Sequence, residues 1–430
     1  ESITPKTPPA LLAVLLPAPA PAGGPAPPPP LSVRCGRIVD PGRREVRGPG
    51  TVHLSGGRVV ESAAPGARTV DLSGLTCLPG LVDAHTHLLL QGDLLAADYD
   101  EQVLKESTAY RALRGAAAGR VALLNGFTTL RDVGTEGAGF ADVDLARAFE
   151  AGVLPGPRVV TSGPAMGVTG SYPLLGYSWE RRMPDGVLKC DGADDCRRAV
   201  RLQVQHGVDW IKVYADRSYR QRPDGSFESI ANFTPAELSA IVDEAHRLRR
   251  KVAAHSITPD GHRAALSAGV DSLEHGDVLD EATLKAMAAR RIPYCPTLTA
   301  GDAVRGPRSA ENPVWQALWD ASQASLRAAL KAGAPVAFGS DAGGFDWHSR
   351  SQADEFVLLV AAGMSPWDAV RSATVVAAEL LGPVKAGRLG CLEPGCVADL
   401  VAVAGDPTAD VAVLKDVRAV VSRGAVVKGP

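Results

Sequence analysis

Residues 251–255 read Lys-Val-Ala-Ala-His, a short apolar run that ends at a histidine. An amphipathic stretch at Pro235–Arg250 precedes this run, and a second apolar run at Ser272–His275 follows it. Short apolar runs that alternate with helical patterns are typical of parallel strands connected by helices. These residues therefore predict an α/β fold for the central part of the chain.

The same alternation continues in both directions along the chain. Six further apolar runs have strand character: Leu81–Ala84, Thr128–Asp132, Arg158–Ser162, Trp210–Tyr214, Ile292–Thr297 and Val336–Asp341. Eight strands alternating with helices predict a (β/α)8 TIM barrel over residues 80–387. An open, doubly wound sheet is the alternative. However, the chain has no GxGxxG after a first strand and no GxxxxGK followed by Ser or Thr, so nucleotide binding has no local support.

Both flanks of this region are rich in short β-like runs. Residues 31–79 contain runs such as Gly50–Leu54 separated by glycine turns, and Asp399–Val403 and Val417–Val421 repeat the pattern. Neither flank is long enough to bury a good core by itself. We therefore predict one small β-sandwich domain, formed by residues 31–79 together with residues 388–430.

The first 30 residues differ in composition from the rest, since 11 of the 33 prolines fall there. Lys6 precedes Leu-Leu-Ala-Val-Leu-Leu at residues 11–16, which resembles a short signal-peptide core followed by a disordered, proline-rich tether. We expect an exported protein, periplasmic or secreted, with a disordered tail on a cytoplasmic protein as the alternative. No stretch reaches 18 uninterrupted apolar residues, so no transmembrane segment is expected.

Charge argues against one class of partner. The chain has 45 Lys and Arg residues against 48 Asp and Glu residues, a formal net charge of −3. A protein that binds nucleic acid usually has a strongly basic surface, so no nucleic-acid partner is expected.

Seven cysteines are present, and an odd number leaves at least one thiol unpaired within the chain. Cys190 and Cys196 flank Asp-Gly-Ala-Asp-Asp, a polar stretch that favours a turn. A disulfide between these two residues is plausible in an exported protein and is our hypothesis. Two free thiols in a loop are the alternative.

Histidines and one acid lie where the predicted strands end. His85 and His87 are two residues apart on the first strand, so their side chains point to the same face. His255 ends the fifth strand, His275 the sixth and Asp341 the eighth. Barrel active sites are built from several strand ends at one face. Each residue alone is more often structural, but together they predict a metal site.

Lys212 lies in the middle of the fourth strand, in the apolar run Trp210–Tyr214. Burying an ammonium group costs free energy. A protonated lysine also has no acceptor with which to bind a metal. Lys212 must therefore be deprotonated or chemically altered if it takes part in the site. An edge position, or an alkyl stem with its amine in solvent, is the structural alternative.

Six residues carry a resemblance to a known family: His85, His87, Lys212, His255, His275 and Asp341. Their order and spacing resemble the metal-dependent amidohydrolase superfamily. Residues 78–87, Leu-Pro-Gly-Leu-Val-Asp-Ala-His-Thr-His, and residues 395–401, Gly-Cys-Val-Ala-Asp-Leu-Val, also match that group. Within it, the chain is similar to a branch with imidazolonepropionase-like, prolidase-like and carboxypeptidase-like members and amidases acting on ochratoxin. The resemblance covers residues 31–430.

The resemblance implies two divalent metal ions, usually zinc. His85, His87 and Asp341 would bind the more buried ion, and His255 and His275 the outer one. Carbon dioxide would convert Lys212 to a carbamate that bridges both ions, which makes the lysine an anionic oxygen ligand. Imidazole and carboxylate ligands suit zinc, although they also accept manganese or cobalt.

The implied reaction is hydrolysis of an amide or peptide bond next to a residue that carries a carboxylate. A hydroxide held between the two ions would attack the carbonyl carbon. Asp341 would accept its proton and pass it to the leaving nitrogen. Asp341, Lys212 and His275 are therefore the expected catalytic residues.

Three residues are candidates for substrate binding. Tyr214 shares the inward face of its strand with Lys212, and in peptidase-like relatives a tyrosine here contacts the terminal carboxylate of the substrate. Tyr172 lies in the loop 166–189, where this chain departs from the Thr-Gly-Gly-His of many relatives. His348, in the last predicted loop, could reach the same pocket. Packing in the core, or exposure on a loop, is the structural alternative for each.

The expected substrate is a small amide or peptide: a dipeptide, an N-acyl amino acid, a carboxypeptidase-type substrate or an aromatic amide such as ochratoxin A. A mononuclear deaminase or cyclic-amide hydrolase of the imidazolonepropionase type is the alternative. Lys212 distinguishes the two, because deaminase branches generally lack the bridging lysine. A relative that has lost catalysis is a third interpretation, which the six filled ligand positions disfavour. The resemblance also implies a homo-oligomer, with an octamer as one form.

Overall fold

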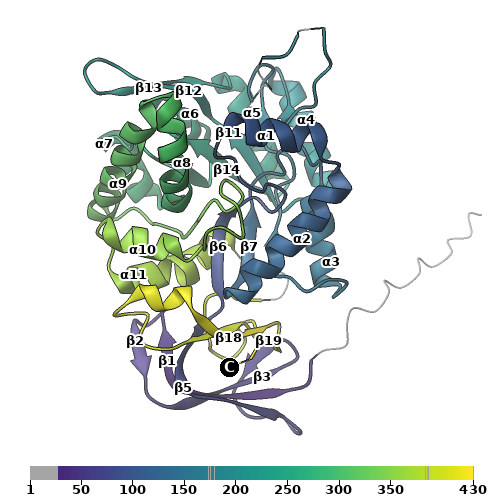
Figure 1. Ribbon diagram of the computed structural model, residues 1–430, viewed down its shortest axis with the longest axis vertical. Helices are drawn as coiled ribbons and strands as arrows, with labels where there is room; N and C mark the ends of the chain where they lie inside the picture. Colours follow the sequence, from purple (N-terminus) through teal and green to yellow (C-terminus); the bar gives the residue numbers. More distant parts are fainter. Residues whose placement is uncertain are drawn as a thin grey trace, which may run out of the picture.

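The computed structural model describes residues 28–429, except Pro173, Leu175, Trp179, Pro383, Lys385 and Ala386. Almost all of the predicted signal-like segment, residues 1–27, lies outside the described residues. Figure 1 shows one sheet at the lower end of the molecule and a larger region of strands and helices above it. The mixed α/β content predicted from the sequence is confirmed.

The larger region contains strands near its centre and helices around them (Figure 1). Its strands are β6 (Leu81–Thr86), β7 (Phe127–Asp132), β8 (Arg158–Val160), β9 (Met166–Gly167), β10 (Leu188–Lys189), β11 (Trp210–Tyr214), β12 (Asp216–Gln221), β13 (Phe227–Ala231), β14 (Lys251–Ser256), β15 (Ser272–His275) and β16 (Tyr294–Cys295). Its helices are α1 (Ala96–Lys105), α2 (Thr108–Leu124), α3 (Ala141–Glu150), α4 (Ala193–His206), α5 (Pro235–Arg247), α6 (Pro259–Ala268), α7 (Glu281–Arg290), α8 (Leu298–Glu311), α9 (Val314–Ala332), α10 (Asp354–Ala361), α11 (Pro366–Arg371) and α12 (Ala377–Leu381).

Helix α5 illustrates why these residues form these elements. Thr234 caps the helix by accepting from the backbone N–H of Glu237, and the Glu237 carboxylate accepts from the N–H of Thr234 in return. Pro235 follows at the first helical position, where the missing N–H costs no hydrogen bond.

Within the described residues, no helix is both long enough and apolar enough to cross a bilayer.

The parallel strands form two sheets, not one. One sheet has the order β10-β9-β11-β14-β15-β16, and the other has the order β6-β7-β8. The predicted eighth strand, Val336–Asp341, is not a strand in the described structure. It still bonds to both neighbouring strands. The Ala337 N–H donates to the Tyr294 carbonyl on β16. On the other side, the Ala84 N–H of β6 donates to the Phe338 carbonyl, and the Asp341 N–H donates to the His85 carbonyl of β6. Gly339 lies so close to β6 that a Cβ there would be 2.7 Å from the Cβ of His85.

Strand register places the candidate residues at one end of the six-stranded sheet. Tyr214 on β11 pairs with His255 on β14, and Ser256 on β14 pairs with His275 on β15. Parallel strands in this register bring their carboxyl ends to the same edge. The side chains at these strand ends can therefore meet in one space, although they are far apart in sequence.

The lower sheet is built from both flanks of the chain. Its eight strands are β1 (Leu31–Asp40), β2 (Glu45–Arg47), β3 (Gly50–Ser55), β4 (Arg58–Val60), β5 (Arg68–Pro79), β17 (Leu400–Val403), β18 (Val417–Ser422) and β19 (Ala425–Lys428). Strand β5 pairs with β1 on one side and with β17 on the other, so it joins the two flanks. These strands share one hydrogen-bonded sheet. The two-sheet sandwich and the domain boundaries remain predictions.

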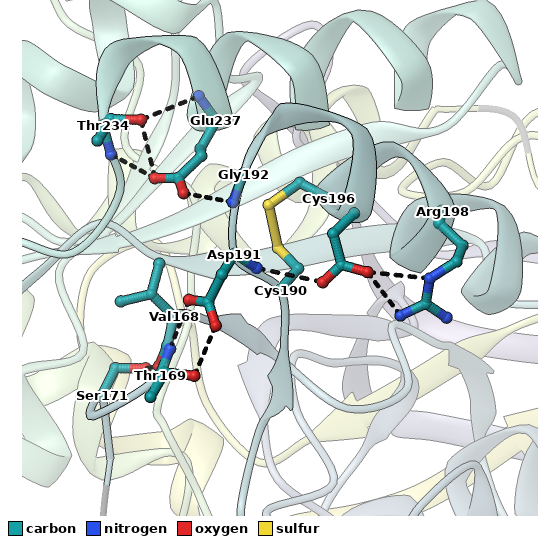
Figure 2. Close-up of a disulfide and its surroundings, with 11 residues drawn as sticks. Val168, Thr169, Ser171, Cys190, Asp191, Gly192, Cys196, Arg198, Thr234 and Glu237 are labelled. Carbon is teal, nitrogen blue, oxygen red and sulfur yellow. Dashed lines mark hydrogen bonds and ion pairs between the residues drawn. A yellow bond between two sulfur atoms is a disulfide. The ribbon is translucent and has the colours of Figure 1, made fainter.

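Three disulfides link cysteines within the described residues: Cys35–Cys77, Cys190–Cys196 and Cys391–Cys396. The hypothesis for Cys190 and Cys196 is thus confirmed. Figure 2 shows that the Asp191 carboxylate, next to this disulfide, accepts hydrogen bonds from the backbone and side chain of Thr169. Cys295 is buried and is not in a disulfide.

We expect the Cys35–Cys77 disulfide to stabilise the fold more than Cys190–Cys196. The first closes a separation of 42 residues and the second a separation of 6. Loop-closure entropy then predicts losses of about 4 and about 2 kcal/mol in the free energy of unfolding when each pair is replaced by serines. Denaturant titration of both double variants without reductant measures the losses. A larger loss for the Cys190–Cys196 pair would contradict the entropic explanation.

Candidate active site

Four histidines and Asp341 gather at the strand ends. Asp341 Oδ1 lies 3.4 Å from His87 Nε2 and 3.7 Å from His85 Nε2. Three potential ligand atoms, one each from His85, His275 and Asp341, lie within 4.8 Å of one another. The rings of His255 and His275 have centroids 4.5 Å apart. The structure thus brings together five of the six predicted ligands. Lys212, the sixth, lines a cavity that opens beside them.

Three of the histidines are oriented by hydrogen bonds at Nδ1. His85 Nδ1 lies 2.8 Å from a carboxylate oxygen of Glu274, and His87 Nδ1 lies 2.8 Å from the carbonyl oxygen of Gly134. His275 Nδ1 lies 2.9 Å from Thr297 Oγ1. The Nε2 atom of His85 is buried and has no hydrogen-bond partner among the described residues. Buried polar atoms usually have partners, and a metal-binding histidine usually donates its other nitrogen in this way. The arrangement therefore fits a metal ion at the Nε2 atoms.

His255 has the opposite orientation. Its Nε2 lies 2.6 Å from the hydroxyl of Tyr219, which leaves Nδ1 as its ligand atom. Tyr219 comes from β12, in the β12–β13 hairpin that follows β11. Sequence reasoning missed Tyr219, because a tyrosine in a polar hairpin carries no local sign of a distant histidine partner.

Glu274 and Arg131 form a buried pair that sequence reasoning also missed. Arg131 Nη2 lies 2.8 Å from Glu274 Oε1, and both side chains are fully buried. The other oxygen of Glu274 binds His85. A charged residue in the apolar run Ser272–His275 was the available signal, since buried charges are almost always paired.

Burial controls the charges in the site. It lowers the pKa values of His85, His255 and His275 well below the usual range, so these imidazoles are neutral, as metal ligands must be. Burial likewise lowers the pKa of the Lys212 ammonium group. It raises the pKa of Asp341, and the nearby Lys212 ammonium opposes that shift. A site of neutral imidazoles and one carboxylate is a donor set that divalent zinc accepts.

Two candidate ligands have a backbone conformation that non-glycine residues seldom adopt. His275 has a φ of 72° and Asp341 a φ of 57°. Such residues persist where the surrounding structure holds them, and they cluster at functional sites. This observation supports a functional role for both residues independently of the ligand distances.

A cavity of about 610 Å³ opens beside these side chains. Its lining includes the candidate ligands His87, Lys212, His255, His275 and Asp341. The lining also includes apolar side chains, among them Ile257, Leu298, Val304 and Trp315. A volume of this size suits a small organic molecule.

The three predicted substrate-binding residues have different positions. Tyr172 and Tyr214 line the cavity, with ring centroids 4.3 Å apart. The Tyr214 hydroxyl donates to Glu136 Oε1 at 2.8 Å. His348 is exposed and is not among the residues that line the cavity, so its role in substrate binding stays a prediction. The Asp346 carboxylate accepts the backbone N–H of His348 at 2.8 Å and holds the turn at the surface.

Comparison with known proteins identifies the family. The pattern of the Amidohydrolase family matches residues 76–427. The chain is 33% identical over 385 residues to ochratoxinase from Aspergillus niger, covering 82% of this chain and 76% of that protein. It resembles the structure of a Xaa-Pro dipeptidase with methionine bound in the active site, with a TM-score of 0.82 and 28% identity. The match covers 93% of this chain and 100% of that chain. It also resembles a prolidase complexed with N-methylphosphonate-L-proline, with a TM-score of 0.81, 29% identity and the same coverage.

The chain belongs to the amidohydrolase family, as its motifs indicated. It is a hydrolase that acts on carbon–nitrogen bonds, and members of this family are generally metal-dependent. The ochratoxinase and prolidase similarities support amide or peptide hydrolysis.

Proposed function

We propose that this protein is a binuclear metal hydrolase that cleaves an amide or peptide bond next to a residue carrying a carboxylate. The observation that carries the proposal is the cluster of four histidines and Asp341 beside a cavity that Lys212 also lines. Substrates of this class include dipeptides, N-acyl amino acids and aromatic amides such as ochratoxin A. Similarity to an ochratoxinase and to prolidases supports this class.

The proposed ligand assignment is the one that the family resemblance implies. His85, His87 and Asp341 would hold the more buried ion, and His255 and His275 the outer ion. Zinc is the proposed metal, because neutral imidazoles suit it. Burial lowers the pKa of Lys212, which favours the neutral amine that can add carbon dioxide. The resulting carbamate would supply bridging oxygens.

The chain's own residues then account for proton transfer. When bound, the two cations would lower the pKa of a water molecule and polarise the substrate carbonyl. Asp341 would accept a proton from the attacking water and return it to the leaving nitrogen.

Two further features belong to the same proposal. We propose that the central strands close a (β/α)8 barrel, because residues 336–342 bond to both β16 and β6, and Thr161, just after β8, accepts from Trp210 on β11. We also propose an oxidising compartment as the site of action. The pairing of six of the seven cysteines in disulfides supports an exported protein.

Removing the metal is expected to abolish hydrolysis reversibly. Chelation should eliminate turnover of N-acyl amino acids and dipeptides, and zinc should restore it with two ions per chain. Elemental analysis and a chromatographic assay of both products measure the result. One ion per chain with release of ammonia would favour the mononuclear deaminase instead.

A further inference from the structure

One lysine and two arginines line the cavity, and they differ in what their side chains contact. Lys212 belongs to the ligand cluster. Arg308 pairs with Asp93, with Nη2 3.3 Å from Oδ2. Arg217 forms no ion pair among the residues that the structure describes, and its one hydrogen bond goes from Nη1 to the carbonyl oxygen of Gly170. A guanidinium group has five N–H donors, so most of those on Arg217 remain available.

The position of Arg217 is set by its hairpin. Figure 1 shows β12 and β13 at the upper end of the molecule, away from the lower sheet. Asp216 anchors this hairpin, because its carboxylate accepts the N–H groups of Ile257 and Thr258 at 3.1 and 3.0 Å. Arg217 follows directly and reaches the loop that contains Gly170. Its guanidinium therefore lies in the cavity wall between the hairpin and that loop.

Other candidates for binding a substrate carboxylate are less suitable. The Tyr214 hydroxyl has one proton, and it donates this proton to Glu136 at 2.8 Å. His348 lies outside the cavity. Arg308 is already paired with Asp93, and it packs over the ring of Trp315 at 4.8 Å. Among the described residues, Arg217 is thus the arginine of the cavity that has no carboxylate partner.

We propose that Arg217 binds the carboxylate of the amino acid whose amide nitrogen is the leaving group. This inference rests on the proposed function and names the residue that sets its substrate class. The planar guanidinium can bind a carboxylate through two parallel hydrogen bonds, which a lysine cannot reproduce. Arg217 selects amides whose leaving group is an α-amino acid over amides of simple amines.

The test compares two substrates that differ only in the carboxylate: N-acetyl-L-phenylalanine and N-acetyl-2-phenylethylamine. With the zinc-loaded wild-type enzyme, we expect a clear preference for the first. Arg217→Gln should lower kcat/KM for the first about 10- to 100-fold, mainly through KM, and leave the second unchanged. Arg217→Lys should restore part of the preference. Arg220→Gln, an exposed arginine on the same strand, is the matched control and should match wild type.

Three outcomes separate the possibilities. An Arg217→Gln variant that keeps the wild-type preference overturns the assignment while the proposed hydrolysis stands. An equal loss for both substrates, with a lowered melting temperature or metal content, also overturns it, because the residue then acts on structure. Wild-type enzyme that cleaves neither substrate, nor any N-acyl amino acid or dipeptide, overturns the proposed function and this inference with it.

Discussion

Replacing Lys212 with alanine is expected to eliminate both turnover and stoichiometric metal binding. Lys212 is almost completely buried beside the histidines, and alanine leaves no group that could bridge two cations. We expect kcat/KM to fall by at least about 10³-fold, because metal catalysis contributes several kcal/mol to lowering the barrier. Elemental analysis should show fewer than two ions per chain. The same preparations supply the kinetic and metal measurements, so the two losses can be compared directly.

A rescue experiment distinguishes a bridging carbamate from a structural lysine. Acetate or propionate can occupy the space left by the Lys212 side chain and supply carboxylate oxygens, so either should restore part of the activity and metal content. Lys251→Ala is the matched control. Lys251 lies at the opposite end of the neighbouring strand β14, where its Nζ donates to the Leu380 carbonyl at 2.6 Å. The Lys251→Ala variant should keep its metal ions. Wild-type activity in Lys212→Ala would exclude the bridging role.

The ligand cluster could be predicted because its signals are local. His85 and His87 lie two residues apart, and Lys212 interrupts an apolar run. The residues that orient the ligands could not be predicted in the same way. Glu274 binds His85 from 189 residues away and Arg131 from 143 residues away. Such pairs depend on how the strands are arranged, and no short stretch of sequence records that arrangement.

Loop residues show a second limit of sequence reasoning. The spacing in the sequence suggested that His348 lies near Asp341. The direction in which a turn residue points depends on local hydrogen bonds, such as the one from the His348 N–H to Asp346. Here this bond holds His348 at the surface. The β12–β13 hairpin carried a usable signal in Asp224-Gly225, a common turn pair between strands. Even with the hairpin recognised, the contact of Tyr219 with His255 depends on how the hairpin folds over β14.

Changing Asp341 to asparagine should reduce kcat strongly while leaving the cavity intact. Asparagine has nearly the same shape, and its amide oxygen can still approach His85 and His87. It cannot accept a proton from water, however, so general acid–base catalysis is lost. That contribution is typically 10²- to 10⁴-fold, and we expect a decrease in kcat of about this size with a smaller change in KM. Steady-state kinetics with parallel elemental analysis measures the effect.

Metal content decides which role of Asp341 the loss reflects. If Asp341→Asn keeps two ions per chain and loses kcat, the carboxylate acts mainly in proton transfer. If ions and kcat are lost together, its contribution as a ligand explains the loss. Asp346→Asn is the control, because this carboxylate binds Gln91 and backbone N–H groups outside the cavity and should leave kcat nearly unchanged. Retention of both full metal content and wild-type kcat in Asp341→Asn would exclude Asp341 as the proton carrier.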